Sequence, residues 1–286
     1  MAKLVVGTAN FDQYYGHGKH KICTKDISRI IQTLKKNKIN YIDTALDYKL
    51  SKKTFGFLKY KNFKIINKIR LPKSKILNFI EKLEKKVNIE LNKYKVKNFE
   101  SLLIHDCRDL QSKYSDEMIN KLFYLKKKKL IKKIGVSIYT PKDLFEVLKK
   151  FKPDLIQLPL NIFDQKFTRN KIVNIFKKYK ILVQVRSIFL QGIIFKNLSE
   201  IQNLSLDRKI KNKLISFQKW CDKKNTSKLE ASIQFIKQFK FINYITIGVN
   251  NKKQLEEIIK VYNSNNKLKI KNFSSINENF IDPRKW

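Results

Sequence analysis

The chain has 286 residues, of which 42% are hydrophobic and 12% aromatic, and this excludes a disordered protein. Its formal net charge is +39, carried by 56 Lys and only seven Arg spread along the whole chain. Arg is the residue that reads bases and phosphates in bidentate geometry, so this balance favours a solvated Lys-rich surface over specific nucleic-acid recognition. No apolar run is long enough to span a membrane. Three widely spaced cysteines (Cys23, Cys107 and Cys221) favour reduced thiols in the cytoplasm.

Short apolar runs alternate with amphipathic stretches along the chain. In chain order, strands are predicted over 4–8, 41–44, 63–68, 101–105, 134–137, 154–157, 181–185 and 244–248. Helices are predicted between them over 25–38, 50–58, 73–92, 115–129, 168–179, 207–222 and 227–239, with a last one over 251–261. A further helix is expected to begin at Pro141, because proline is favoured at the first helical position.

This alternation gives eight strand–helix units. The strands are near-continuous apolar runs, as in parallel sheets that are covered on both faces. Strict alternation over about 250 residues favours a single (β/α)8 TIM barrel, with a doubly wound open sheet as the alternative. No linker rich in Pro, Gly or Ser divides the sequence, so residues 1–286 are predicted to form one domain. The chain has no G-x-G-x-x-G and no Walker A loop, which weakens the open-sheet alternative.

Polar residues stand at the predicted carboxyl ends of six strands, where barrel enzymes place their active sites. They are Asp43, Lys68, His105, Ser137, Gln157 and Arg186. Any one of them alone could be a hydrogen-bonded core residue or a lysine that reaches solvent. Six in register predict a functional site at this face.

Asp43-Thr44-Ala45-x-x-Tyr48, a Lys at the end of the third strand and Leu102-Leu103-Ile104-His105-Asp106 together resemble the aldo/keto reductase superfamily. The resemblance runs from Gly7-Thr8 to Gly248. It is closest to a bacterial subgroup associated with surface-polysaccharide or sugar biosynthesis, through residues 4–11, 135–140, 157–165 and 186–192. It implies a TIM barrel that reduces aldehydes or ketones with NAD(P)H and uses no metal.

The catalytic residues implied by the resemblance are Asp43, Tyr48, Lys68 and His105, and their chemistry suits carbonyl reduction. Tyr48 would donate the proton. A buried Lys68 ammonium beside it would favour proton release, because a nearby positive charge stabilises the anion. Asp43 would keep Lys68 charged and in place. His105 would donate a hydrogen bond to the substrate carbonyl and orient it. The plainer interpretation is a buried ion pair that happens to have a tyrosine neighbour.

The cofactor contacts implied by the resemblance follow the strand ends and the last loop. They are Gly7, Thr8, Ser137, Gln157, Arg186, Ser187, Phe189, Gln191, Gly192, Gly248, Asn250, Gln254 and Glu257. Ile138 stands where many relatives have Asn, and Arg186 where many have an aromatic that stacks on the nicotinamide. Lys252 or Lys253 could meet a 2′-phosphate, so the cofactor is predicted to be NADPH, or else NADH. A solvated surface role for these two lysines is an equal alternative.

The predicted substrate is a sugar or sugar-derived carbonyl, phosphorylated or nucleotide-linked, with Tyr14, Tyr15, Tyr139, Phe163 and Phe189 as candidate pocket walls. Two other function classes stay open. One is a cofactor-binding regulatory protein with little turnover, and the other is a basic binder of nucleic acid or an anionic surface. His17-x-x-His20-x-x-Cys23 has metal-like spacing but lacks a fourth ligand, so no metal is predicted.

Overall fold

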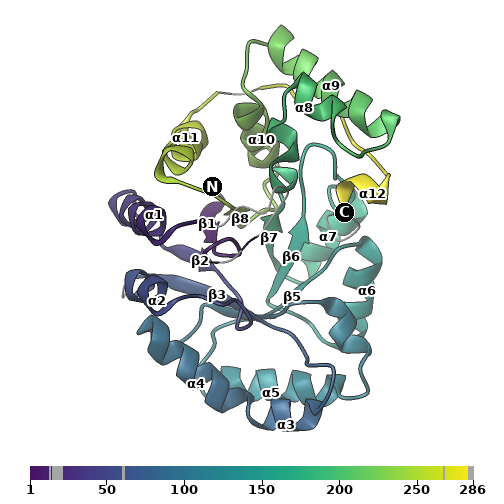
Figure 1. Cartoon of the computed structure of the whole chain (residues 1–286). Helices are drawn as coiled ribbons and strands as arrows, with labels where there is room; N and C mark the ends of the chain where they lie inside the picture. Colours follow the sequence, from purple (N-terminus) through teal and green to yellow (C-terminus); the bar gives the residue numbers. More distant parts are fainter. Residues whose placement is uncertain (13, 15–21, 60–61, 267, 283–286) are drawn as a thin grey trace.

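The computed structural model describes residues 1–12, 14, 22–59, 62–266 and 268–282. Eight strands close into a parallel barrel in chain order, with helices around it (Figure 1). The strands are β1 (Lys3–Gly7), β2 (Tyr41–Asp43), β3 (Lys64–Ile69), β4 (Ser101–Ile104), β5 (Ile134–Ser137), β6 (Leu155–Pro159), β7 (Leu182–Arg186) and β8 (Tyr244–Ile247). β8 pairs with β1, with Leu4 opposite Ile245. The (β/α)8 barrel predicted from the sequence is confirmed, and the open-sheet alternative is wrong.

The helices that cover the barrel follow the predicted ones closely. They are α1 (Thr24–Lys36), α2 (Lys52–Leu58), α3 (Ile76–Glu81), α4 (Leu83–Tyr94), α5 (Ser115–Lys127), α6 (Pro141–Lys150), α7 (Asn170–Lys178), α9 (Arg208–Lys223), α10 (Lys228–Lys237) and α11 (Lys252–Asn263). Pro141 is the first residue of α6, as predicted, and Thr140 and Asp143 close a capping box around it. No helix among the described residues is long and apolar enough to cross a membrane.

One predicted helix differs in the structure. The single helix expected over 73–92 begins at Ile76, after Lys75 in the left-handed region, and is divided into α3 and α4 at Lys82, where ψ is 0°. The apolar spacing still follows one buried face across the break, through Ile80, Leu83 and Val87. Four short elements were not predicted, because each spans six residues or fewer and is too short to show a periodic pattern. They are η1 (Cys107–Gln111), η2 (Leu190–Phe195), α8 (Leu198–Gln202) and α12 (Glu278–Ile281).

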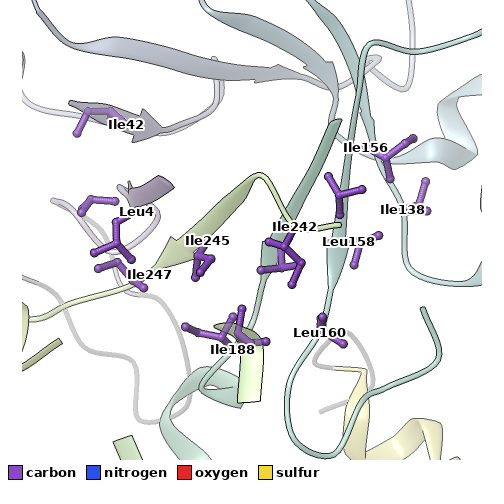
Figure 2. Close-up of a cluster of buried hydrophobic side chains, with 14 of the residues drawn as sticks. Leu4, Ile42, Ile138, Ile156, Leu158, Leu160, Ile188, Ile242, Ile245 and Ile247 are labelled. Carbon is purple, nitrogen blue, oxygen red and sulfur yellow. The ribbon is translucent and has the colours of Figure 1, made fainter. Parts of the chain in front are cut away.

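The barrel separates two apolar cores. The larger one lies between the strands and the helices, and Figure 2 shows part of it, including Leu4, Ile42 and Ile247. A small cluster of its own is formed by Val5, Tyr41, Ile66, Leu103, Leu155 and Tyr244. Along a strand, side chains alternate between the two faces, so residues two apart share a face. The alternation of β1, in which Val5 belongs to the small cluster and Leu4 and Val6 to the large one, shows this division.

The same alternation positions the polar strand ends. Two residues beyond Tyr41, Ile66 and Leu103 of the small cluster stand Asp43, Lys68 and His105. The apolar cluster therefore closes the barrel from below, and the polar residues form the next layer toward the carboxyl ends. Gly135 of β5 is required for this packing, since a Cβ there would lie 2.8 Å from both Leu103 Cγ and the Leu155 carbonyl oxygen.

Candidate active site

A cavity of about 500 Å³ opens at the carboxyl ends of the strands. It extends from the polar layer of the barrel to the first turns of α11. All four predicted catalytic residues line it, together with twelve of the thirteen predicted cofactor contacts. Those twelve are Gly7, Ser137, Gln157, Arg186, Ser187, Phe189, Gln191, Gly192, Gly248, Asn250, Gln254 and Glu257. The fold thus brings residues from the carboxyl ends of all eight strands, and from the loops that follow β7 and β8, to one surface.

At the base of the cavity, Lys68 and Asp43 form a buried ion pair between Nζ and Oδ1. Their side chains are only 4% and 8% exposed. Lys68 Nζ also donates to the Thr44 carbonyl oxygen at 3.0 Å. Burying two charges is costly unless their remaining hydrogen-bonding positions are filled, so this pair depends on its neighbours.

Two amide side chains provide those neighbours on the Asp43 side. Gln157 Nε2 and Gln184 Nε2 donate to Asp43 Oδ2 at 2.7 and 2.9 Å. Because a carboxylate only accepts, both amides turn their nitrogen toward it. Gln184 also donates to Thr246 Oγ1 at 2.7 Å. The sequence analysis missed Gln184 and Thr246, although Gln184 lies two residues before Arg186 and therefore on the same face of β7.

Tyr48 and His105 stand above the ion pair. Lys68 Nζ lies 5.8 Å from the centre of the Tyr48 ring, and the Tyr48 and His105 rings meet edge to face with centres 6.2 Å apart. Burial, together with the positive charges of Lys68, Arg70 and Arg186, lowers the pKa of His105 from 6.5 to about 3. His105 is therefore a neutral imidazole at physiological pH, with one N–H to donate.

Arg186 lies over an aromatic ring at the wall of the cavity. Its Cζ lies 4.2 Å from the centre of the Tyr139 ring, and its guanidinium donates to the Ile138 carbonyl oxygen at 3.4 Å. The chain then turns sharply, because Ser187, Leu190, Gln191 and Gly192 all have positive φ. Three of these are not glycine, so the segment holds a strained backbone where it lines the cavity. Asn161 Nδ2 fixes it by donating to the Ser187 carbonyl oxygen at 3.1 Å.

The far end of the cavity is built at the start of α11. Asn251 caps this helix by accepting from the Gln254 backbone N–H at 2.9 Å, and Gln254 Oε1 accepts from the Asn250 N–H at 2.8 Å. Asn10, from the loop after β1, donates through Nδ2 to the Val249 carbonyl oxygen at 3.0 Å and to Asn250 Oδ1 at 2.9 Å. These bonds fix the loop after β8 against the loop after β1.

Some predicted residues take other places. Thr8 does not line the cavity, because it is fully buried and its hydroxyl bonds to Thr44 Oγ1 at 2.9 Å. Of the candidate pocket walls, Tyr139 and Phe189 line the cavity, whereas Phe163 packs in an aromatic cluster with Phe217 and Phe280. Tyr14 is 71% exposed and lies outside the lining. Tyr15 lies outside the described residues.

The metal-like spacing of His17, His20 and Cys23 is tested only in part. His17 and His20 lie outside the described residues, and Cys23 Sγ donates to Asp26 Oδ2 at 3.1 Å. Elsewhere in the described chain, no group of three or more His, Cys, Asp or Glu is arranged to hold a metal ion.

Comparison with known proteins agrees with this geometry. The family model described as the aldo/keto reductase family matches residues 3–279, so the chain belongs to that family. It is an NAD(P)H-dependent oxidoreductase whose substrate is a small-molecule carbonyl. No curated protein sequence matches the chain.

Solved structures share the fold at low sequence identity. An aldo-keto reductase from Bacillus halodurans, in its holo form, is 17% identical with a TM-score of 0.75, covering 93% of this chain and 88% of that one. A glycerol dehydrogenase from Gluconobacter oxydans is also 17% identical, with a TM-score of 0.70, covering 93% of this chain and 87% of that one. At this identity the likeness demonstrates the barrel and nothing finer.

Proposed function

We propose that this enzyme reduces an aldehyde or ketone by hydride transfer, with Tyr48 as the proton donor. The observation that carries the proposal is the meeting of Asp43, Tyr48, Lys68 and His105 at the base of one cavity. The buried ion pair places the Lys68 ammonium 5.8 Å from the centre of the Tyr48 ring. That charge favours the tyrosinate left behind when the proton moves to the substrate oxygen.

His105 would hold the substrate carbonyl. Since its pKa is about 3, it remains neutral and cannot compete with Tyr48 as an acid at physiological pH. Its remaining function is to donate one N–H to the carbonyl oxygen and so orient it beside the Tyr48 hydroxyl. The edge-to-face contact with Tyr48 fixes the two donors relative to each other.

The residues of the cavity fit a nicotinamide dinucleotide, which would supply the hydride. Gln157 uses its amide nitrogen on Asp43, so Oε1 is the atom that it can offer to a carboxamide N–H, with the Ser137 hydroxyl nearby on the next strand. Arg186 and the strained segment from Ser187 to Gly192 would hold the pyrophosphate. Gly248, Asn250, Gln254 and Glu257 would hold the adenosine end. The cofactor is NADPH or NADH.

For the substrate we propose a sugar or sugar-derived carbonyl that carries a phosphate or a nucleotide. Arg186, a cation of the cavity lining, acts on His105 and would attract an anionic substrate to the reacting end. The resemblance to the sugar-biosynthesis subgroup points to the same class. The formal net charge of +39 suits binding of an anionic metabolite. The three free thiols suit a cytoplasmic location.

A titration with NADH and NADPH, followed by protein fluorescence at about 150 mM salt, tests the cofactor site first. Micromolar, saturable binding of either nucleotide supports the proposal. A screen of sugar carbonyls should then identify substrates whose reduction is lost in Tyr48→Phe. Turnover that is unchanged in Tyr48→Phe would refute Tyr48 as the proton donor.

A further inference from the structure

The adenosine end of the cavity contrasts in charge with the rest of the molecule. The chain carries 63 Lys and Arg, yet among the described residues that line the cavity only Lys68 and Arg186 are cations. Both act on His105 and therefore lie at the catalytic end. Around the start of α11 the lining consists of Asn10, Asn250, Gln254, Glu257 and Ile258, which include a carboxylate and no cation.

Lys252 and Lys253, in the first turn of α11, do not supply the positive charge that the lining lacks here. Lys252 pairs with Glu256 at 3.5 Å, with both side chains about half exposed. Lys253 is exposed, and neither lysine lines the cavity. The sequence had suggested that one of them meets a 2′-phosphate, and this geometry does not favour that interpretation.

Two backbone N–H groups at this helix N-terminus already have partners. Helix N-termini bind phosphate through free backbone N–H groups. Here the Gln254 N–H is taken by the Asn251 side chain, and the Asn250 N–H is taken by Gln254 Oε1. A phosphate that used either of these groups would have to displace its bond, and Glu257 adds a carboxylate to the same lining.

We propose that this cavity selects NADH over NADPH, with Glu257 as the discriminating residue; the proposal rests on the dinucleotide site proposed above. A 2′-phosphate monoester carries about −1.5 to −2 charges at pH 7 and has no donor of its own to offer a carboxylate. A ribose 2′-hydroxyl can donate to a carboxylate or an amide oxygen and brings no charge. A lining of one carboxylate and three amide side chains suits the hydroxyl and repels the phosphate.

The test is the ratio of the two dissociation constants, measured by fluorescence titration at about 150 mM salt so that general attraction to the basic surface is screened. NADH should bind at least about tenfold more tightly than NADPH, which corresponds to about 1.4 kcal/mol. Glu257→Gln should reduce this ratio by at least about threefold, mainly by tightening NADPH binding. The control is Glu117→Gln, which removes the same charge from the exposed surface of α5, outside the cavity, and it should leave the ratio unchanged.

Three outcomes would overturn this inference alone. Equal or tighter binding of NADPH would refute the preference while leaving the proposed reductase intact. An equal effect of Glu117→Gln and Glu257→Gln would show that general charge, rather than Glu257, sets the ratio. A loss of NADPH binding in Lys253→Ala would show that a lysine reaches the 2′-phosphate after all. Failure of both nucleotides to bind would instead refute the proposed function, and this inference with it.

Discussion

The catalytic end of the cavity and the end at α11 differ in where their polar groups find partners. Asp43 accepts hydrogen bonds from β3, β6 and β7, through Lys68, Gln157 and Gln184, and all these side chains are buried. At α11, by contrast, the side chains of Asn251 and Gln254 bond to backbone groups within four residues of themselves, and Asn250 Oδ1 accepts from Asn10 Nδ2 of the loop after β1. The first site is held by bonds between strands, and the second by a helix cap together with a bond to one loop.

This difference matches the two tasks that the site must perform. Proton transfer needs charges held in fixed positions in a region of low dielectric, which the closed barrel provides. A nucleotide that must bind and leave in every cycle is better served by groups near solvent. Changes at the catalytic end should therefore affect chemistry and stability strongly, whereas changes at the α11 end should affect affinity modestly.

The largest effect is expected from Tyr48→Phe. Loss of a positioned proton donor should lower kcat for carbonyl reduction by about 10²- to 10⁴-fold. The dissociation constant of the nucleotide should stay within about twofold, because the adenosine end is untouched. Stopped-flow reduction and fluorescence titration measure the two quantities, with Tyr179→Phe on the surface of α7 as the control. A parallel loss of binding and turnover would contradict the separation of the two ends.

The second prediction concerns the buried ion pair. Lys68→Met leaves Asp43 buried without its cation, so the free energy of unfolding should fall by about 3–5 kcal/mol. Lys149→Met serves as the matched control, because Lys149 pairs with Glu146 at 2.9 Å on the surface and the two side chains are 69% and 50% exposed. That control should cost less than about 1 kcal/mol. Urea unfolding of both variants measures the difference, and similar losses would show that burial of the Lys68–Asp43 pair does not matter.

The third prediction concerns the pH dependence of stability. The pKa of His105 is about 3 in the fold and 6.5 in the unfolded chain, so below pH 6.5 the unfolded chain binds a proton that the fold excludes. The stability due to neutral His105 is complete above pH 6.5 and is lost as the pH falls toward 3, by at most about 1.4 kcal/mol per pH unit. His105→Gln should show a shallower decline in urea unfolding over this range. Parallel declines in the two proteins would argue against a neutral His105.

The sequence predicted the barrel well because its signals are local. Each strand is an apolar run and each helix has a periodic face, and strict alternation leaves few topologies. The position of three proposed catalytic residues in the cavity was predictable for the same reason: Asp43, Lys68 and His105 come directly at strand ends. Thr8 also stands at a strand end, but its side chain is buried against Thr44 and does not line the cavity. The start of α11 was located correctly, but the absence of Lys252 and Lys253 from the cavity lining depends on side-chain directions that no sequence pattern reports.

Gln184 illustrates what the sequence could not show. It lies within an apolar strand, and its importance depends on Asp43, 141 positions away in the chain, which only the closed barrel brings within 2.9 Å. It acts through Asp43 as a positioning residue. Each hydrogen bond that Asp43 accepts spreads its charge and weakens its hold on the Lys68 ammonium, which leaves more of the positive charge to act on Tyr48.

Gln184→Met should therefore have the smallest effect on rate of the changes proposed here, with kcat falling by about three- to tenfold, as expected for one hydrogen bond to a charged group. The alkaline limb of the kcat–pH profile should move to higher pH, because a more tightly held Lys68 favours the tyrosinate less. Gln234→Met is the matched control, since Gln234 is also a buried amide but bonds to Ser264, far from Asp43 in the chain. The control should lower stability and leave the limb in place. If Gln184→Met also lowered only stability, Gln184 would be a packing residue and the catalytic end would depend on Gln157 and Lys68 alone.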